Sequence, residues 1–468
     1  MLIFTFLSSD PGAMAREIRE AVRHRNASSR SKKPRYDANP SSTPEQNPGG
    51  MDSDSRGPVT PLPSSITSRL SLEVYEHIID DLHTDSEGQS PSQLSVCSLV
   101  CRAWLAPSRR RLFASVNLRP EFVAFLRASS HAYDTIVPHI RELGVGGGWL
   151  HHDRSDFSST MLFMTDLVKL RALNLEAWSW SYLSTSTASK LLRGEGPAFR
   201  VLTALDLKYI QFPSLSALAT LISAFVRLKT LAFDNVTWET SDDAMPLAPP
   251  FVSSLTKLHV VACSNEVLIS WLFADALGDP IVKLKLRSLS LPDILPNEAG
   301  NIDRLVSSTS SSLEHLDVGF MGHSTDDAPV ILKLAEKIDL SPHTQLCSLH
   351  VHQIVLYQFP GTPPHSSQSS PAVNLPTTWL ASLLSTIRSA HFSRLTLSIW
   401  LGEERQLDSL DWDGFVRIVS NERFASLTQV EFRVRGLGKA MNDVVKGWIS
   451  DRMSGWARVT ECLQITFG

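Results

Sequence analysis

LTALDL, residues 202–207, carries the pattern that decides the fold: an apolar residue, two others, Leu, one other residue and a second apolar residue. Alternate apolar residues in such a short segment are typical of a strand with one buried face. Nine further segments repeat the pattern: IRELGV (140–145), LRALNL (170–175), LKTLAF (228–233), LTKLHV (255–260), LRSLSL (286–291), LEHLDV (313–318), LCSLHV (346–351), FSRLTL (392–397) and LTQVEF (427–432). The sequence therefore predicts ten short strands that turn the same side to a common core.

The central residue of each segment is Leu, or Val430 in the last, and most intervals between these residues are 26–33 positions. The interval of 46 between Leu349 and Leu395 contains a Pro/Ser-rich stretch, residues 360–376, which predicts an exposed insertion. Apolar segments with helical spacing, such as SALATLISAFVRL (216–228), lie between the strands. One strand and one helix every ~20–30 residues is the leucine-rich-repeat geometry. We therefore predict an α/β fold in which residues 116–468 form an irregular leucine-rich-repeat solenoid.

If the central leucines face the core, the residues between and beside them face an open surface. These residues are Asn174, Glu176, Asp206, Lys208, Asp234, Lys257, His259, His315, Asp317, His350, His352, Arg394, Glu431 and Arg433. They include five acids and four Lys/Arg. A nucleic-acid groove is predominantly basic, so this mixed surface favours a protein partner.

The amino-terminal region has a different composition. Residues 26–65 are rich in Ser, Pro, Asn and Gly and lack the apolar content of a core, so residues 1–65 are predicted to be a disordered leader. Its basic run RSKKPR (30–35) is either a nuclear import signal or, as we favour, a solvated charge cluster. Met51 is an alternative start to Met1.

Residues 66–115 predict a small module of two or three amphipathic helices. In RLSLEVYEHIIDDL (69–82) the apolar residues recur at helical spacing, and LSVCSLVCRAWLAPSRRRLF (94–113) repeats that spacing. Pro107 is expected to end the second helix. The module has more apolar residues than 50 residues can bury, so a partner or the first repeats should cover some of them.

No metal site or catalytic site is predicted. Cys97 and Cys101 offer only two ligands four residues apart, and a zinc site needs three or four. His259, His315, His350 and His352 share the predicted open surface, but the first three belong to separate repeats, so the histidines are not expected to meet at one ion. The chain has no HExxH motif and no phosphate-binding glycine loop. GHSTD (322–326), which resembles a nucleophile elbow with Asp in place of its second Gly, is interpreted as a polar loop. We expect no cofactor and no enzymatic activity.

Net charge, cysteine content and the length of apolar stretches limit where the chain can be located and what it can bind. A formal charge of −4 and a pI near 6.4 are unlike those of a general nucleic-acid binder. Five scattered cysteines indicate a reducing compartment. The apolar start MLIFTFLSS is short for a secretory signal, and no stretch is long enough for a membrane span. The chain is expected to be cytoplasmic or nuclear, without membrane contact.

The module followed by repeats resembles the F-box family, specifically fungal F-box proteins with leucine-rich repeats. The resemblance is carried by Leu70-Ser71-Leu72-Glu73-Val74, by Leu99-Val100-Cys101-Arg102-Ala103-Trp104 and by Leu112-Phe113. Ser71 stands where the family has proline, which helps to start the first helix and contacts the partner.

The resemblance implies a substrate adaptor of a cullin-RING ubiquitin ligase. The helices would bind the cullin adaptor protein and the repeats a protein substrate, so this chain would supply proximity. We predict nine partner-binding residues: Leu70, Leu72, Val74, Ile78, Ile79, Leu82, Leu94, Val100 and Trp104. Two alternatives remain open, a protein-binding scaffold without a ligase and, as a weaker candidate, an enzyme.

Overall fold

The computed structural model describes eleven stretches of the chain and the single residue 249. The described residues are 73–74, 76–79, 102–128, 130–146, 154–240, 249, 252–263, 265–273, 284–295, 298–320, 337–355 and 375–468. The contacts within the chain divide it into two units, Met1–Ser68 and Arg69–Gly468, and every described residue belongs to the second unit. The predicted leader (1–65) and residues 360–374 of the predicted insertion (360–376) lie outside the described residues, whereas residues 375 and 376 begin a helix.

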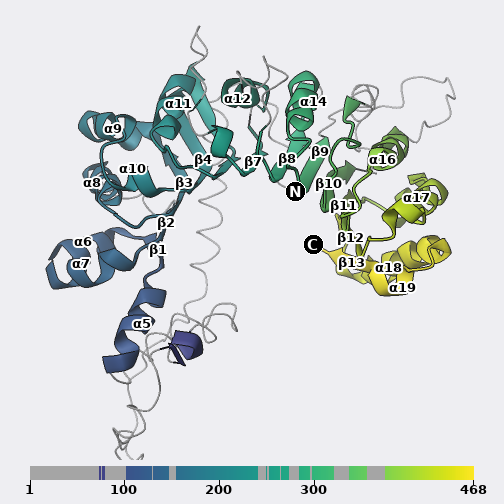
Figure 1. Ribbon diagram of the computed structural model, residues 1–468, viewed down its shortest axis with the longest axis horizontal. Helices are drawn as coiled ribbons and strands as arrows, with labels where there is room; N and C mark the ends of the chain where they lie inside the picture. The colour runs from purple at the N-terminus through teal and green to yellow at the C-terminus, as the bar shows by residue number, and fades with distance from the viewer. Residues whose placement is uncertain are drawn as a thin grey trace, which may run out of the picture. The chain divides into compact units, whose positions relative to one another are not determined.

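The second unit is built on one parallel sheet of 13 strands (Figure 1). Twelve strands pair in chain order, and β6 pairs separately with β4. The strands are β1 (Ser115–Leu118), β2 (Glu142–Val145), β3 (Ala172–Ser179), β4 (Ala204–Ser214), β5 (Thr230–Asp234), β6 (Thr237–Thr240), β7 (Lys257–Val261), β8 (Ser288–Ile294), β9 (His315–Phe320), β10 (Ser348–Val355), β11 (Arg394–Trp400), β12 (Gln429–Arg435) and β13 (Leu463–Phe467).

The central residues of the ten sequence segments form one column across the sheet. Leu143 pairs with Leu173, and Leu173 with Leu205, without any offset. The column continues in the same way to Leu395 and Val430, and all ten side chains are at most 2% exposed. The prediction that these ten segments are strands with a buried central residue is confirmed.

Helices connect the strands and cover one face of the sheet, as Figure 1 shows for the segments after β2. The described α-helices are α5 (Arg102–Leu112), α6 (Pro120–Ala128), α7 (Ser130–Ile136), α8 (Arg154–Thr165), α9 (Thr185–Leu192), α10 (Ala198–Val201), α11 (Leu215–Ser223), α12 (Asn265–Leu272), α14 (Ala299–Ser308), α16 (Leu375–Thr386), α17 (Trp412–Val419), α18 (Asn442–Arg452) and α19 (Val459–Cys462). In α11 the Ser214 hydroxyl caps the helix by accepting from the Ala217 N–H, and Leu218, Leu221 and Ile222 are buried. The apolar faces of the helices therefore complete the core that the strands begin.

The strands bend at a recurring position four residues after the central leucine. Five non-glycine residues there have a positive φ: Ala177, Tyr209, Asn235, Ala262 and Gln353. The left-handed conformation is uncommon for such residues. This conformation turns the next side chain toward the core, as the burial of four such residues shows: Trp178, Ile210, Val236 and Ile354.

The predicted architecture, an F-box-like helical module followed by an irregular leucine-rich-repeat solenoid, is wrong. A solenoid stacks near-uniform repeats that contact only their neighbours, whereas here helices of 4 to 12 residues and strands of 4 to 11 belong to one continuous α/β sheet. The repeated segment specifies strands and their register, and it does not specify a uniform repeat. Of the predicted module 66–115, the described residues contain helical positions 73–74 and 76–79, α5 and the start of β1, and these show no F-box module.

One local prediction is wrong, and two strands were missed. Pro107 does not end a helix, because α5 continues through it to Leu112 and the Pro107 ring is buried, which offsets the lost backbone hydrogen bond. Strands β1 and β13 were not predicted. In β1, Phe113, Val116 and Leu118 fit the pattern with Val in place of Leu, whereas β13 has no apolar residue three positions before Leu463.

The buried column gives a stability prediction. Leu289 is 0% exposed and lies between Leu258 and Leu316, so Leu289→Ala leaves a cavity and should lower the free energy of unfolding by about 2–5 kcal/mol. Chemical denaturation of the full chain measures this change. Val226→Ala, at a residue that is 56% exposed, should cost under ~0.5 kcal/mol, and equal losses in the two variants would contradict the assignment.

A second prediction concerns pH. His343 is 0% exposed, its Nε2 lies 2.9 Å from the Val306 carbonyl oxygen, and burial lowers its pKa below 6.5. The unfolded chain therefore binds a proton at this residue at a higher pH than the folded chain does, so acidification through pH 6.5 favours the unfolded state. The stability advantage of the wild type over His343→Gln should shrink between pH 7 and pH 5 in urea titrations. An advantage that is constant or grows on acidification would contradict the assignment.

Candidate binding face

The sheet face opposite the helices brings together the residues that the sequence placed on an open surface. We call this the open face; it consists of the positions one residue before, one after and three after each central leucine. All 14 residues predicted for the open surface occupy such positions. The positions after the leucines form a continuous row of paired residues: Asn174, Asp206, Ala232, His259, Ser290, Asp317, His350, Thr396 and Glu431.

The open face is acidic at β3–β5. Asp206 and Lys208 form an ion pair of 2.9 Å, and this contact raises the pKa of Lys208. Burial raises the pKa of the Asp234 carboxyl. Asn174 Oδ1 and Asp206 Oδ1 are buried and have no hydrogen-bond partner among the described residues. These two acceptors are suited to donors from a bound molecule.

A second polar cluster lies at β11–β13. Arg433 binds Glu431 with two contacts of 2.8 and 3.0 Å, and Thr396 and Thr466 donate to the same carboxylate at 3.4 and 3.2 Å. The Arg433 guanidinium holds the pKa of Glu431 below its usual range. This bidentate pair is internally neutral and fixes its end of the open face.

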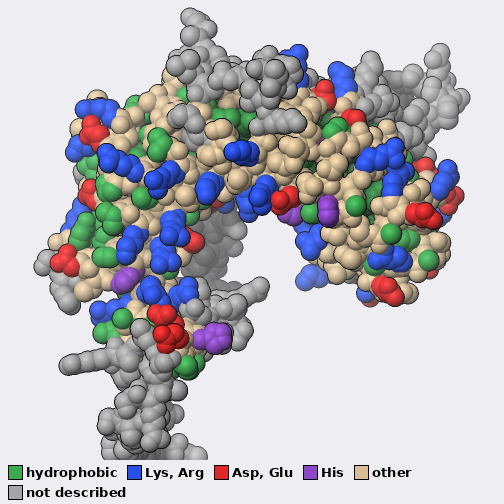
Figure 2. All heavy atoms as spheres, viewed as in Figure 1, with side chains coloured by type: hydrophobic (Ala, Val, Ile, Leu, Met, Phe, Trp, Pro, Cys, Tyr) green, Lys and Arg blue, Asp and Glu red, His purple; other side chains and the backbone are tan. Residues whose placement is uncertain are grey.

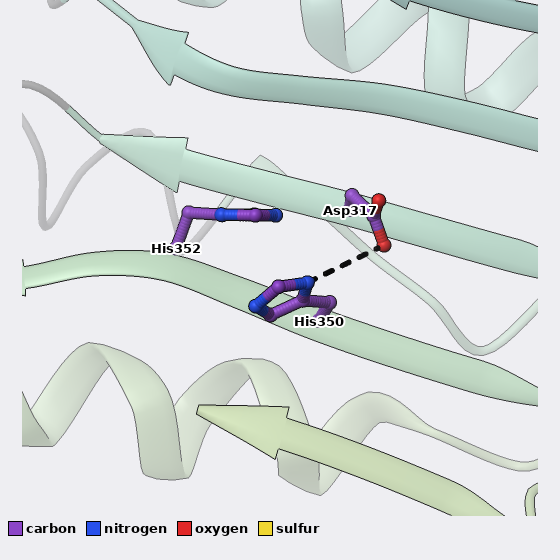
Figure 3. A group of neighbouring side chains, drawn as sticks. All are labelled: Asp317, His350 and His352. Atoms are coloured by element: carbon purple, nitrogen blue, oxygen red, sulfur yellow. Dashed lines mark ion pairs between the residues drawn. The ribbon is translucent and has the colours of Figure 1, made fainter. Parts of the chain in front are cut away.

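Three side chains converge at the middle of the open face: Asp317 on β9 and His350 and His352 on β10 (Figure 3). His350 Nδ1 lies 4.0 Å from Asp317 Oδ1, and the two imidazole ring centroids are 3.6 Å apart. His350 Nε2 lies 2.8 Å from Ser398 Oγ, whereas His352 Nε2 is buried without a hydrogen-bond partner among the described residues. We call these three residues the central cluster.

Burial governs the protonation of the central cluster. It lowers the pKa of His350 to about 3 and that of His352 to about 4, and in each case positive charges nearby act in the same direction. Burial also raises the pKa of Asp317, although a hydrogen bond from Ser290 opposes this. Both rings are therefore neutral at physiological pH and offer lone pairs as well as N–H groups.

The sequence-based argument concerned His259, His315 and His350 and left out Asp317, and the two histidines that meet here, His350 and His352, lie on one strand. Residues on separate strands were treated as distant, but hydrogen-bonded strands lie only ≈ 4.8 Å apart. Asp317 and His350 are direct register partners, and His352 extends from the same face two residues later. Alignment of LEHLDV with LCSLHV on their central leucines contains this signal.

A basic edge runs along the amino-terminal ends of the strands, and the sequence analysis missed it. Arg141, Arg171, Lys229 and Arg287 each stand two residues before a central leucine, and Lys169, Arg227 and Lys285 stand four before; all seven are exposed. Backbone hydrogen bonds join the first set through Thr203 and Thr256. Figure 2 shows Lys and Arg gathered over this part of the sheet with few acids between them. The basic residues precede four strands, β2, β3, β5 and β8, and Thr203 and Thr256 stand at the equivalent position before β4 and β7. The row crosses these six paired strands and therefore spans about 24 Å at the usual strand spacing.

Only part of the predicted docking segment is described. Val74 is 41% exposed, Ile78 and Trp104 are half-buried, and Ile79 is fully buried. Arg110 on α5 binds Glu76 at 2.7 Å, which ties the two helical pieces together. The remaining predicted partner-binding residues, Leu70, Leu72, Leu82, Leu94 and Val100, lie outside the described residues, as do Cys97, Cys101 and the segment 322–326.

No described helix is long and apolar enough to cross a membrane. The described cysteines Cys263, Cys347 and Cys462 are free thiols, and burial raises the pKa of Cys263 to about 12, so its thiol is not an activated nucleophile. The best-defined cavities within the described residues are lined almost wholly by apolar side chains between the sheet and its helices. The open face and the basic edge are therefore the surfaces suited to binding.

Comparisons with known proteins give little further guidance. No protein-family model matches the chain, and no curated protein matches it. Among solved structures, the chain is similar to a chain in the crystal structure of the yeast Rad7 and Elc1 complex, at 15% identity and a TM-score of 0.37. The match covers 83% of this chain and 86% of that chain. A likeness at this level carries no argument about function.

Proposed function

We propose that the protein is a substrate adaptor of a cullin-RING ubiquitin ligase, working in the cytoplasm or the nucleus. In this proposal segment 66–115, whose motifs resemble the F-box family, binds the cullin adaptor protein, and the sheet binds a protein substrate. The chain performs no chemistry of its own and raises the effective concentration of the substrate near the ubiquitin-loaded enzyme.

The observation that carries the proposal is the open face, a row of polar and charged side chains across β3–β12. Its exposed members include Glu176, Lys257, His259, Arg394 and Arg433. The open face carries both acidic and basic side chains, which suits a folded protein or a peptide as partner. The buried acceptors Asn174 Oδ1 and Asp206 Oδ1 have no donor among the described residues. This surface fits recognition better than catalysis.

The basic edge suggests the chemistry of the substrate. Arg141, Arg171 and Lys229 have no ion pair among the described residues, whereas Arg287 lies 3.4 Å from Glu314. Unpaired cations in a row attract an acidic segment and accelerate its association. A substrate with an acidic stretch beside its docking surface matches both features.

Docking of the cullin adaptor protein is tested at Val74. Val74→Asp introduces a charge at an exposed position of the predicted docking helix and should weaken binding of the cullin adaptor protein by at least tenfold in a biolayer interferometry titration with the full chain. Val444→Asp is the matched control, because Val444 is 44% exposed and lies on α18.

Equal binding by Val74→Asp and wild type would overturn this docking assignment. Failure of the wild type to bind the cullin adaptor protein would favour the second candidate, a protein-binding scaffold without a ligase. Ser71 in place of the family's proline favours that candidate, since the proline contacts the partner in the family that the motif resembles.

Recognition by the basic edge is tested by charge reversal. Lys229→Glu should weaken capture of the substrate several-fold at low salt and reduce the dependence of its association rate on ionic strength. Affinity purification from cells identifies the substrate, and a salt series with the purified pair measures both quantities. Lys190→Glu on α9 is the control. An unchanged salt dependence in Lys229→Glu would contradict a role for the edge.

A further inference from the structure

We propose that Asp317, His350 and His352 form a binding site for a divalent transition metal ion, with Zn²⁺ as the best-matched ion. Metal binding by these residues does not depend on the proposed ligase role. The site lies within the open face, so a bound ion would stand where a protein partner docks.

The fold places the three ligands together without any loop. His350 and His352 are alternate residues of β10 and therefore project from the same face, and Asp317 is the register partner of His350 on β9. One ligand atom from each of the three residues lies within 4.8 Å of the others. Ligands at ~2.0–2.2 Å from a tetrahedral Zn²⁺ stand about 3.4 Å apart, so modest side-chain rotations close the set.

The hydrogen bonds determine which atoms are free to bind the ion. Ser398 Oγ occupies His350 Nε2 at 2.8 Å, which leaves Nδ1 facing Asp317. A ligating imidazole whose second nitrogen is hydrogen-bonded in this way is the usual arrangement at protein zinc sites. His352 Nε2 is buried and has no described partner, and a metal would satisfy it. Ser290 binds the Asp317 carboxylate and orients it.

Gly319 makes room for the cluster. It is the register partner of His352, and a Cβ at this position would lie 2.7 Å from the His352 Cβ and 2.0 Å from the Pro292 carbonyl oxygen. A side chain at position 319 would therefore displace His352 from the position in which it faces Asp317. The absence of a side chain here keeps the two histidines stacked on the open face.

The local charge permits a cation. Asp317 and two neutral imidazoles carry one negative charge, which a divalent ion converts to one positive charge. The neighbouring cation Arg433 is held by two contacts with Glu431, and His315 Nδ1 lies 2.8 Å from Ser348 Oγ. Two nitrogens and one carboxylate oxygen suit Zn²⁺, Co²⁺ or Ni²⁺ and suit Mg²⁺ or Ca²⁺ poorly.

Three protein ligands leave one coordination position open to the open face. At zinc sites of this composition the fourth position holds water or a ligand from a bound molecule. If the sheet binds a protein substrate, a side chain of that substrate is a candidate for this position. That step alone rests on the proposed function.

The test uses the full chain after dialysis against EDTA. Titration with Zn²⁺ in a calorimeter should show a site of one ion per chain, and His350→Ala and His352→Ala should each weaken that site at least tenfold. His315→Ala is the matched control, because His315 is an exposed histidine on β9 that is outside the cluster, and it should bind as the wild type does.

Co²⁺ substitution separates this site from cysteine sites elsewhere in the chain. The visible spectrum should show tetrahedral Co²⁺ without the intense near-ultraviolet band of thiolate ligands, and Asp317→Asn should change that spectrum. Circular dichroism and thermal unfolding verify that each variant is folded, and His352→Asn replaces any variant that is not.

Three results would overturn the site: no ion bound by wild type at 100 μM Zn²⁺, equal affinity in wild type and the two His→Ala variants, or a thiolate spectrum. A wild type that binds Zn²⁺ but not the cullin adaptor protein would refute the proposed function alone. A wild type that binds the cullin adaptor protein but not Zn²⁺ would refute the metal site alone.

Discussion

The parallel register of one buried residue per strand is the constraint on which the rest of the structure depends. Each central leucine pairs with the central leucine of the next strand, and the carbonyl two residues before it accepts hydrogen bonds from two N–H groups of the neighbouring chain segment, as Arg171 does from Thr203 and Ala204. Full burial of such a side chain is worth roughly 1.5–3 kcal/mol, and a slip by one residue would turn every leucine to solvent. The column therefore fixes the alignment of strands whose connecting helices differ widely in length.

That register also decides the chemistry of the opposite face. Because side chains alternate, burial of Leu316 and Leu349 commits Asp317 and His350 to the open face and makes them direct neighbours. The same geometry joins Asn174 to Asp206 and Thr396 to Glu431. The polar clusters are thus set by the apolar column, and a change at an open-face position alters the polarity and charge of that face without altering the strand order.

The sequence predicted the ten strands and their buried residues because each strand carries its own local pattern. It did not predict the architecture, since the pattern contains no information on how unequal helices and long strands join into one continuous sheet. Strand β13 was missed because Leu463 begins it without an apolar residue three positions earlier, and the run of α5 through Pro107 was missed because burial of the ring offsets the broken hydrogen bond. The basic edge escaped notice because Arg141, Arg171 and Lys229 are separated by 30 and 58 positions in the sequence and enter one row only through the ladder.

The buried polar groups of the central cluster lower the stability of the folded chain. A buried polar atom without a partner, such as His352 Nε2, destabilises a protein by about 1–3 kcal/mol, and His350 is held neutral by the same burial. Elsewhere along the row, Ala232 shows that a small apolar side chain fits an equivalent position. An apolar pair at 350 and 352 would fill the same space without the desolvation cost, so packing alone does not account for the two imidazoles. A ligand that satisfies both nitrogens and the Asp317 carboxylate does account for them, and Gly319 is then part of the same site, because it provides the space that the second imidazole needs.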